Sequence, residues 1–380
     1  MQRPGCQIPG VDDPAALPQR LDGTQPRDHA MPPILARRRT VLGMASALAA
    51  GGVVPAGRAA DAAPEQAAIE LAAVRDTQLG AQVAVADALS LFKPQGLEVT
   101  VHWTQSGADI ITFMAGRAQY LCAGGSFSGI VLASQGLPVR IIAALADMAG
   151  TQGLALAPGV TLASPADLMG KKLAYTQGTP NTLILAKLAQ TYGFDASKVS
   201  LISMEPTEGV TAALRGDVQG ILGFEPFLYR LVHMGGTLYV TGTELDVTGT
   251  PRRLAMEDRL IYVHSCLLAA QDWIATKPNT LQAVLRGLQA ATDVINHDRP
   301  RAVAVMQKLL HLEEDAVTRI MSENSYSLAI DDALARSIRF QSDWAVGIKR
   351  IPMPVSPQQL IDPTLLRAVD PALVTWSGKA

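Results

Sequence analysis

The fold is decided by the stretch Leu97-Glu-Val-Thr-Val-His-Trp-Thr-Gln-Ser-Gly-Ala-Asp-Ile-Ile-Thr-Phe-Met-Ala115. Apolar and polar residues alternate over Leu97–Trp103, and several are β-branched, which predicts a strand. Ala108–Ala115 has the spacing of a helix, and Ser106 with Asp109 fits a capping box at its start. A strand that leads through a short polar loop into a helix is the repeating unit of parallel α/β sheets.

This unit recurs along the chain. Small polar loops also join a predicted strand to a predicted helix at Thr77–Gly80, Ala123–Ser126 and Thr176–Asn181. In the last loop, Thr179 followed by Pro180 predicts an N-cap and the first residue of a helix. Open α/β sheets bind ligands at loops of this kind, where free N–H groups of helix N-termini can hold an anion and glycines allow close approach.

The pattern starts twice, which indicates two similar lobes. Gly116–Gly124 and Gly216–Gly223 echo each other, each with a glycine after a helix, a polar pair and a buried strand. After a last strand at Leu260–Ala270 the chain is almost wholly helical. The predicted strands before it are Ile69–Val74, Leu97–Trp103, Gln119–Ala123, Val139–Leu145, Leu154–Ala157, Lys172–Tyr175, Val199–Met204 and Val218–Phe224, and Thr241–Asp258 is predicted to be a loop.

Composition excludes two classes of function. The 380 residues carry a net charge of -2 with both signs dispersed, and no run of Lys or Arg follows residue 54, so we expect no nucleic-acid partner. No apolar run of about 18 residues follows Val54 either, so we expect no membrane span in the mature part. With 48% hydrophobic residues, the chain has ample material for a core.

The N-terminal region predicts export. Arg37-Arg-Arg-Thr-Val-Leu42 precedes a short uncharged run that ends at Val54, as in a twin-arginine signal, and Met31 is a plausible start. The alternatives are an N-terminal membrane anchor or a disordered leader. We expect residues 1–62 to be the leader of a periplasmic protein exported by the twin-arginine route, without a lipid anchor because no cysteine follows the apolar run.

Motifs of chemistry are scarce. No HExxH, paired CxxC, P-loop or GxGxxG is present, and the serines of Gly124–Gly129 are out of register for GxSxG, so we predict no catalytic residues, no metal site and no cofactor. Cys6 lies in the leader. Cys122 and Cys266 lie in apolar runs and are predicted to be buried thiols. The sequence does not decide whether they form a disulfide with each other.

Several segments resemble one family, the periplasmic substrate-binding proteins of the alkanesulfonate, nitrate and taurine ABC transporter group, which includes binders of thiamine-pyrimidine precursors. The resemblance extends from about Ile69 to about Ala368, with Gln119 where the family usually has Asp and Phe224 in place of Trp. The matching segments are Ala88–Val99, Gly116–Tyr120, Ser134–Leu145, Ser164–Tyr175, Gly178-Thr179 and Phe224–Phe227.

The resemblance implies a type II periplasmic-binding-protein fold, in which two α/β lobes with a hinge enclose a ligand cleft and a helical extension ends the chain. Lobe 1 would comprise residues 63–153 and 258–380, and lobe 2 residues 154–257. The crossings would lie near Ala149–Leu154 and Asp258–Val263. The implied partners are a small-molecule ligand and the permease of an ABC importer, and the implied state is a monomer.

The resemblance also implies a ligand site. No arginine lies in a predicted cleft loop, which favours recognition of an anion by dipoles and hydroxyls, or of a neutral ligand. A small organic anion of the sulfonate type is the first expectation and a small heteroaromatic compound the second, with Phe127 and Phe224 suited to an organic tail. The ligand-binding residues carried over by position are Gln78, Ser106, Gly125, Ser126, Gly178, Thr179 and Glu225.

Two alternatives remain open at this stage. The first is an enzyme on the same fold, similar to pyrimidine synthases or desulfinases, which would need Cys122 or Cys266 in the cleft beside a histidine. The cysteine-rich metal motif of the thiamine-precursor enzymes is absent, which argues against that activity. The second alternative is a ligand sensor that uses the same closed state.

Overall fold

The predicted strand–loop–helix units are present in the computed structural model, which describes residues 62–246 and 250–378. The stretch Leu97–Ala115 folds as strand β2 (Glu98–Thr104) and helix α2 (Gly107–Ala115). Asp109 Oδ2 accepts the backbone N–H of Ser106 at 3.0 Å, so the predicted capping box is confirmed. The twin-arginine signal and Cys6 lie outside the described residues.

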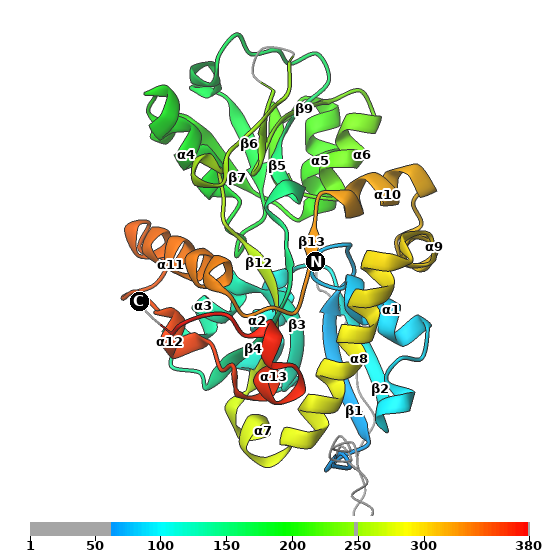
Figure 1. Ribbon diagram of the computed structural model, residues 1–380. Helices are drawn as coiled ribbons and strands as arrows, with labels where there is room; N and C mark the ends of the chain where they lie inside the picture. Colours follow the sequence, from blue (N-terminus) through cyan, green and yellow to red (C-terminus); the bar gives the residue numbers. More distant parts are fainter. Residues whose placement is uncertain (1–61, 247–249, 379–380) are drawn as a thin grey trace, which may run out of the picture. The chain divides into compact units, whose positions relative to one another are not determined.

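A first sheet has six strands in the order β13-β4-β12-β3-β1-β2 (Figure 1). Its parallel part joins β1 to β2 and β3, and β12 runs antiparallel between β3 and β4. Helices α3 and α11 lie on one side of the strands, and α1 and α8 on the other. The elements not yet delimited are β1 (Ala68–Val74), β3 (Leu121–Gly125), β4 (Val139–Asp147), β12 (His264–Ala270), β13 (Ser325–Tyr326), α1 (Ala81–Ala88), α3 (Ser126–Ser134), α8 (Pro278–His297) and α11 (Asp332–Gly347).

A second sheet has seven strands in the order β11-β10-β9-β5-β8-β6-β7. Its parallel part is β7-β6-β8, and β5 joins β8 to β9 with antiparallel pairing on both sides. The strands are β5 (Gln152–Leu156), β6 (Lys172–Tyr175), β7 (Ser200–Ser203), β8 (Gly220–Phe224), β9 (Thr237–Thr241), β10 (Glu244–Leu245) and β11 (Arg252–Arg253), and the helices are α4 (Thr182–Tyr192), α5 (Pro206–Arg215) and α6 (Phe227–His233).

The two predicted α/β lobes are therefore present, each built around its own sheet. The chain leaves the first sheet at the end of β4 and enters the second at β5, through the short turn Ala149–Thr151. It returns between β11 and β12. Residue boundaries for the two lobes, and hinge motion at these crossings, stay predictions.

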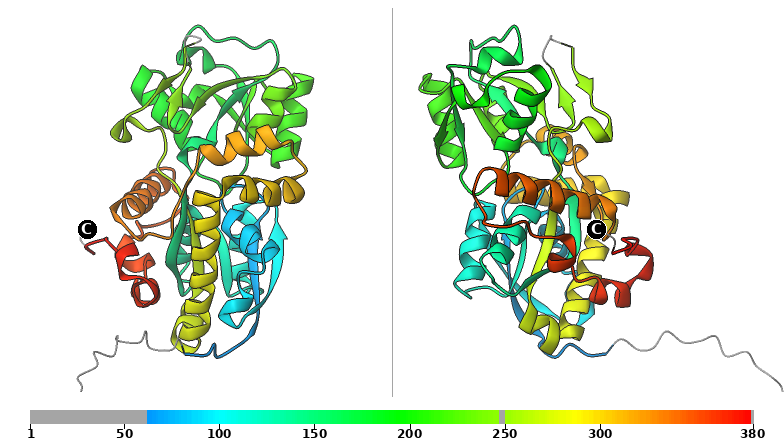
Figure 2. Two further views of the ribbon diagram at one scale, coloured as in Figure 1. Left: turned by 45° about the vertical axis from the view of Figure 1, so that its right-hand side comes forward. Right: turned by 90° about the vertical axis from the view of Figure 1, so that its left-hand side faces the viewer.

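The C-terminal helices reach both lobes, which the sequence did not indicate. After α8 come α9 (Arg299–Leu310) and α10 (Glu314–Ser322), and α10 lies beside α5 and α6 in both figures of the ribbon (Figures 1 and 2). Arg319 of α10 pairs with Glu225 after β8 at 3.1 Å, and its guanidinium lies over the Tyr229 ring. The remaining helices, α7 (Gln271–Thr276), α12 (Pro357–Leu360) and α13 (Thr364–Val369), contact elements of the first lobe.

Three local predictions are wrong. Thr179 does not cap a helix, because its hydroxyl donates to the Thr176 carbonyl at 2.7 Å and α4 begins only at Thr182. The last strand begins at His264 rather than Leu260, because the backbone N–H of Leu260 is bonded to the Gly242 carbonyl instead of a sheet neighbour. The predicted loop after Thr241 contains the short antiparallel pair β10 and β11.

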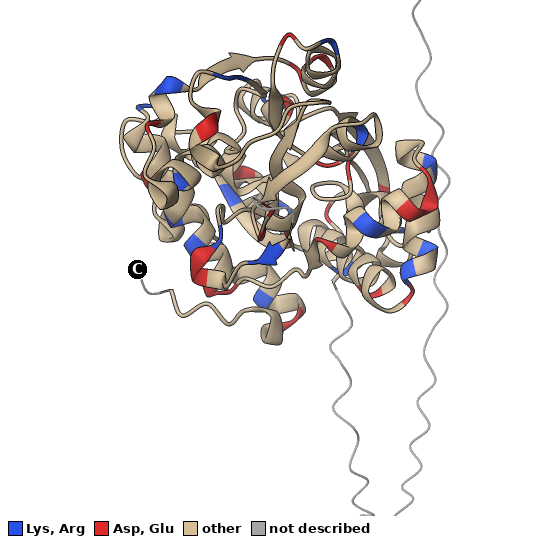
Figure 3. Cartoon of the chain, turned by 90° about the horizontal axis from the view of Figure 1, so that it is seen from above, with Lys and Arg blue, Asp and Glu red and all other residues tan. Residues whose placement is uncertain are grey.

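Charges and thiols agree with an ordinary globular chain. Lys and Arg are interspersed with Asp and Glu over the described ribbon (Figure 3). Cys122 and Cys266 are both buried and both free, so the disulfide considered from the sequence is not present. None of the described helices is both long and apolar enough to cross a bilayer.

Candidate functional site

A cavity of about 460 Å³, open solvent within it included, is lined by residues of both lobes. It lies where the strands of both sheets end and the following helices begin. The lining residues are Val74, Asp76, Gln78, Leu79, Ser106, Gly107, Gly125, Phe127, Ser128, Met148, Gln152, Gly178, Thr179, Pro180, Asn181, Phe224 and Val263.

Three helices begin at this cavity. Ser106 is the N-cap of α2, Gly125 the N-cap of α3 and Asn181 the N-cap of α4. The first N–H groups of a helix have no partner within it and carry the positive end of the helix dipole. Two of these helices come from the first lobe and one from the second, so the cavity has a favourable potential for an anionic group on both sides.

The structure brings five of the seven predicted ligand-binding residues together. They are Gln78, Ser106, Gly125, Gly178 and Thr179, and all of them line the cavity. Their contact with a ligand stays a prediction. An added Cβ at Gly125 would have its nearest atoms 3.8 Å away, whereas at Gly178, whose φ is +86°, it would lie 3.3 Å from the Cβ of Ala108.

The other two predicted residues are not among those that line the cavity. Ser126 Oγ accepts from Gln341 Nε2 at 2.9 Å and from the backbone N–H of His264 at 3.3 Å. Glu225 accepts the backbone N–H of Tyr229 at 2.8 Å and pairs with Arg319. Burial raises the pKa of the Glu225 carboxyl, and the Arg319 charge opposes that rise.

A chain of amide side chains connects the lobes beside the cavity. Gln78 Nε2 donates to the backbone carbonyl of Glu225 at 2.6 Å, and Gln78 Oε1 accepts from Gln152 Nε2. Gln152 Oε1 in turn accepts from Asn181 Nδ2 at 3.1 Å. Gln78, Gln152 and Asn181 all line the cavity, so a change in the separation of the lobes must break or re-form bonds at the cavity wall.

An acidic side chain also lines the cavity. Asp76 follows β1, is 2% exposed, and uses Oδ1 to accept the backbone N–H groups of Gln78 at 2.8 Å, Leu79 at 2.6 Å and Gly80 at 3.3 Å. Burial raises the pKa of the carboxyl to about 6, although the three N–H groups oppose the rise. Its second oxygen, Oδ2, has no hydrogen-bond partner among the described residues.

The rest of the lining is largely apolar. Phe127 and Phe224 face the cavity from different lobes, as the sequence suggested for an organic tail. Each ring has an aromatic neighbour, with centroids 5.6 Å apart for Phe127 and Trp344 and 5.4 Å for Phe224 and Phe227. Rings held in this way form walls of fixed position.

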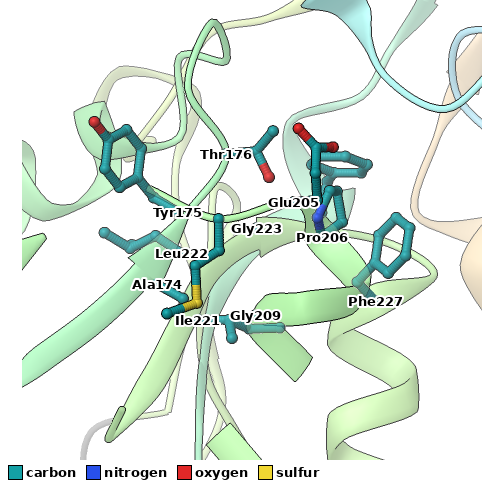
Figure 4. Close-up of a pocket in the computed structure, with 12 residues that line it drawn as sticks. Ala174, Tyr175, Thr176, Glu205, Pro206, Gly209, Ile221, Leu222, Gly223 and Phe227 are labelled. Atoms are coloured by element: carbon teal, nitrogen blue, oxygen red, sulfur yellow. The ribbon is translucent and has the colours of Figure 1, made fainter. Parts of the chain in front are cut away.

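A second, smaller hollow of about 250 Å³ lies in the second lobe alone, between the ends of β6 and β8 and the start of α5 (Figure 4). Thr176, Glu205 and Phe227 are among its lining residues. Glu205 forms a capping box with Glu208 at the start of α5, which already accounts for its position. Of the residues that the sequence suggested for the ligand, only Phe224 lines this hollow, so we take the cavity between the lobes as the candidate site.

The thiols lack the environment of a nucleophile. Burial raises the pKa of the Cys122 thiol to about 12 and raises that of Cys266 further. Neither residue lines the cavity. His264 is near Cys266 in the chain, but its ring is bonded to Ser337 Oγ at 2.7 Å, and burial lowers its pKa.

Sequence reasoning missed four polar residues of the cavity, namely Asp76, Ser128, Gln152 and Asn181. A signal existed for two of them. Asp76 is the first acidic residue after a buried strand and immediately precedes the Thr77–Gly80 loop, and Asn181 ends the Thr176–Asn181 loop. Gln152 carried no signal, because its place in the cavity depends on the crossing between the lobes.

Comparisons with known proteins agree with this architecture. A family profile described as "NMT1/THI5 like" matches residues 80–302. The taurine-binding periplasmic protein of Escherichia coli (strain K12) is 28% identical over 142 residues, which is 37% of this chain and 43% of that protein, so the chain matches less than half of that relative's length.

Two solved structures illustrate the fold. The alkanesulfonate-binding protein SsuA of Xanthomonas axonopodis pv. citri, bound to MOPS, superposes with a TM-score of 0.64 and 14% identity over 82% of this chain and 99% of that chain. The desulfurization enzyme DszB superposes with a TM-score of 0.61 and 13% identity over 80% of this chain and 99% of that chain. The type II periplasmic-binding fold expected from the sequence is confirmed, and it occurs in both binding proteins and an enzyme.

Proposed function

Because this chain belongs to the NMT1/THI5-like family, as the family resemblance of the sequence indicated, we propose that it is the solute-binding component of an ABC importer. It captures a small organic solute of the sulfonate type in the cavity between its lobes and presents the closed complex to a permease. The chain itself catalyses no reaction and acts as a monomer.

The observation that carries this proposal is the cavity itself. It is lined from both lobes, three helices begin at it, and apolar rings form much of its wall. A ligand that contacts both lobes favours the closed form over the open one, which is how a binding protein reports occupancy to a partner. Helix N-termini suit the anionic end of such a solute, and the rings suit its organic end.

An enzyme of the same fold is the second candidate, since DszB shares the architecture. A thiol mechanism needs an accessible thiolate beside a base. Cys122 and Cys266 are both 0% exposed with raised pKa values, and neither lines the cavity, so the described residues favour binding over thiol chemistry. A sensor would use the same cavity and differ only in the partner that reads the closed form.

We further propose that the mature protein works in the periplasm. The E. coli relative is a periplasmic protein by name, and Arg37–Leu42 with the following uncharged run supports export by the twin-arginine route.

A thermal-shift screen followed by calorimetry tests the function. The panel comprises alkane- and arylsulfonates, carboxylates, nitrate and pyrimidines. A ligand present at 100 times its Kd stabilises the folded state by about 2.7 kcal/mol, which gives a clear rise in Tm. Stabilisation by a sulfonate supports the proposal. Turnover of any panel member by the purified protein would favour the enzyme instead.

A further inference from the structure

Helix α10 is attached to the first lobe at both ends but reaches the second lobe. Before it, α9 packs on α1 and α8, and after it β13 pairs with β4 in the first sheet. Between these attachments Arg319 Nη2 donates to Glu225 Oε1 at 3.1 Å, and the guanidinium carbon lies 5.2 Å from the centre of the Tyr229 ring. A helix of one lobe therefore places a cation against the other lobe.

Glu225 is bonded in several directions at once. Its backbone N–H donates to the carbonyl of Thr151, in the turn where the chain crosses between the lobes, at 2.9 Å. Its backbone carbonyl accepts from Gln78 Nε2 of the cavity wall at 2.6 Å. Its carboxylate accepts from Arg319 and from the backbone N–H of Tyr229. The residue that the family resemblance assigned to the ligand therefore links the cavity wall, the crossing and α10.

The end of α10 also contacts the crossing. Asn324 Oδ1, just after the helix, accepts from the Thr151 hydroxyl at 3.2 Å. A Cβ added at Gly150 would lie only 2.7 Å from the backbone carbonyl oxygen of Glu323, which is closer than non-bonded atoms approach without a clash. Because the crossing turn lies against the end of α10, a rotation of the second lobe about this turn moves that lobe relative to α10.

The contact between α10 and the second lobe is partly open to solvent. The side chain of Arg319 is 44% exposed, against 6% for Glu225. Beside the pair lies a groove of about 930 Å³, open solvent included, between α5, α6 and the loop that precedes α10. An ion pair in this setting contributes modestly to overall stability, but a modest free energy is enough to shift an equilibrium between two arrangements of the lobes.

We propose that α10 is a latch on the closed form, in which the Arg319–Glu225 pair joins the lobes only when they are closed and holds part of the protein closed before a solute arrives. The inference rests on the proposed function, in which closure captures the solute, and it identifies what sets the closed fraction. Neither residue lines the cavity, so the latch does not read the chemistry of the solute. It changes the affinity for every solute alike, because apparent affinity scales with the fraction of protein in the binding-competent form.

The main test measures the ligand-free protein, so it does not depend on which solute binds. Asp87→Cys on α1 and Gln190→Cys on α4 place spin labels at exposed positions of the two lobes. Cys122 and Cys266 are both 0% exposed and stay unlabelled, and Cys6 is removed by Cys6→Ser. Pulsed dipolar electron resonance then gives the distances between the lobes. We expect two populations, one of them at the distance of the closed arrangement.

Arg319→Gln is the variant, because it removes the charge and keeps a polar side chain. It should lower the ratio of closed to open protein about fivefold, the effect of one partly exposed ion pair. Arg319→Lys keeps the charge but loses the planar guanidinium and should give an intermediate ratio. Arg301→Gln is the matched control, since Arg301 is exposed on α9 and forms no ion pair with another described residue, and it should leave the ratio unchanged.

Affinity gives a second readout. Ethanesulfonate and benzenesulfonate, titrated calorimetrically, should each bind Arg319→Gln more weakly than the parent, and both by the factor by which the closed fraction falls. A residue that shaped the cavity wall would affect two solutes of such different size unequally.

A salt series on the unaltered protein does not depend on a substitution at the latch. Raising the ionic strength from about 0.05 M to about 1 M shortens the Debye length to about 3 Å, so the closed fraction of the ligand-free parent should fall. The closed fraction of Arg319→Gln should change less, because the variant has no ion pair left to screen.

The outcomes separate the latch from the proposed function. A ratio of closed to open protein that is the same in the parent and in Arg319→Gln overturns the latch, as does a closed fraction of the parent that is insensitive to salt. Either result leaves the solute-binding function standing. Failure of every compound in the wider panel to bind the parent overturns the proposed function, and the ligand-free distances still decide the latch.

Discussion

Replacing Asp76 by Asn should stabilise the ligand-free protein at neutral pH. The carboxyl has a pKa of about 6 in the folded state against a model value of 3.8, and burial is the main cause. The difference of about two pKa units corresponds to about 3 kcal/mol in favour of the protonated form on folding. Asparagine is neutral at every pH and can accept the same backbone N–H groups, so the variant does not bury a charge on folding.

The sign of the pH dependence follows from the raised pKa. Below pH 3.8 the carboxyl is protonated in both states and adds no penalty. As the pH rises from 3.8 to about 6, the unfolded chain loses its proton first, so the folded state is progressively destabilised, and the loss is complete above pH 6. The unfolding free energy of Asp76→Asn should therefore exceed that of the parent protein by about 3 kcal/mol at pH 8, and by about half of that at pH 5.

Urea denaturation followed by tryptophan fluorescence, from pH 5 to pH 8, measures this difference. Other titrating groups, including Glu225 and His264, contribute to both proteins, so subtracting the two curves isolates Asp76. The reasoning is refuted if the difference in unfolding free energy is independent of pH, or if the variant is the less stable protein at pH 8. A confirmed difference would mean that the chain retains a carboxylate at a cost in stability, as binding sites often do.

Three further predictions concern the lobes and the leader. Arg319→Ala should lower the unfolding free energy by about 1 kcal/mol at pH 7, because it leaves the buried Glu225 carboxylate without its ion pair, whereas the guanidinium that it removes is partly exposed and solvated. An unchanged unfolding free energy in urea denaturation would show that the ion pair does not stabilise the protein. Small-angle scattering should record a smaller radius of gyration when a solute that binds by calorimetry is added, and an identical curve would contradict closure of the lobes. Changing Arg38 and Arg39 together to Lys should leave precursor in the cytoplasm on fractionation, whereas normal export of that double variant would exclude the twin-arginine route.

The architecture could be predicted from the sequence because its signals are local. Alternation in Leu97–Trp103 and the capping box of Ser106 and Asp109 depend on neighbours a few residues away, and both are confirmed. The prediction that Thr179 caps a helix was wrong, although Thr-Pro is a suitable motif for a helix start. The Thr179 hydroxyl bonds to the Thr176 carbonyl instead, and the helix starts later, at Thr182. Local motifs allow a cap, and the surrounding loop determines whether it forms.

The candidate site was predicted only in part, because the cavity is made by long-range contacts. Gln78 and Gly178 were assigned by position from the family resemblance, in loops that follow strands, and both line the cavity. Gln152 was not found, because its role depends on bonds to Gln78 and Asn181, which are far away in the chain. Glu225 was assigned to the ligand by position, yet its carboxylate pairs with Arg319 of a C-terminal helix that no local pattern placed beside it.

A calorimetric titration of a cavity-filling variant tests the central claim most directly. Gly125 has extended backbone dihedrals that valine readily adopts, and the nearest atoms to an added Cβ are 3.8 Å away, so Gly125→Val should fold normally and occupy the cavity. Gly347→Val, outside the cavity with open space around its Cβ, is the control. The account predicts that a solute bound by the parent and by Gly347→Val loses at least tenfold in affinity with Gly125→Val, while the circular dichroism spectrum stays unchanged. Undiminished affinity in a folded Gly125→Val protein would show that the solute binds elsewhere.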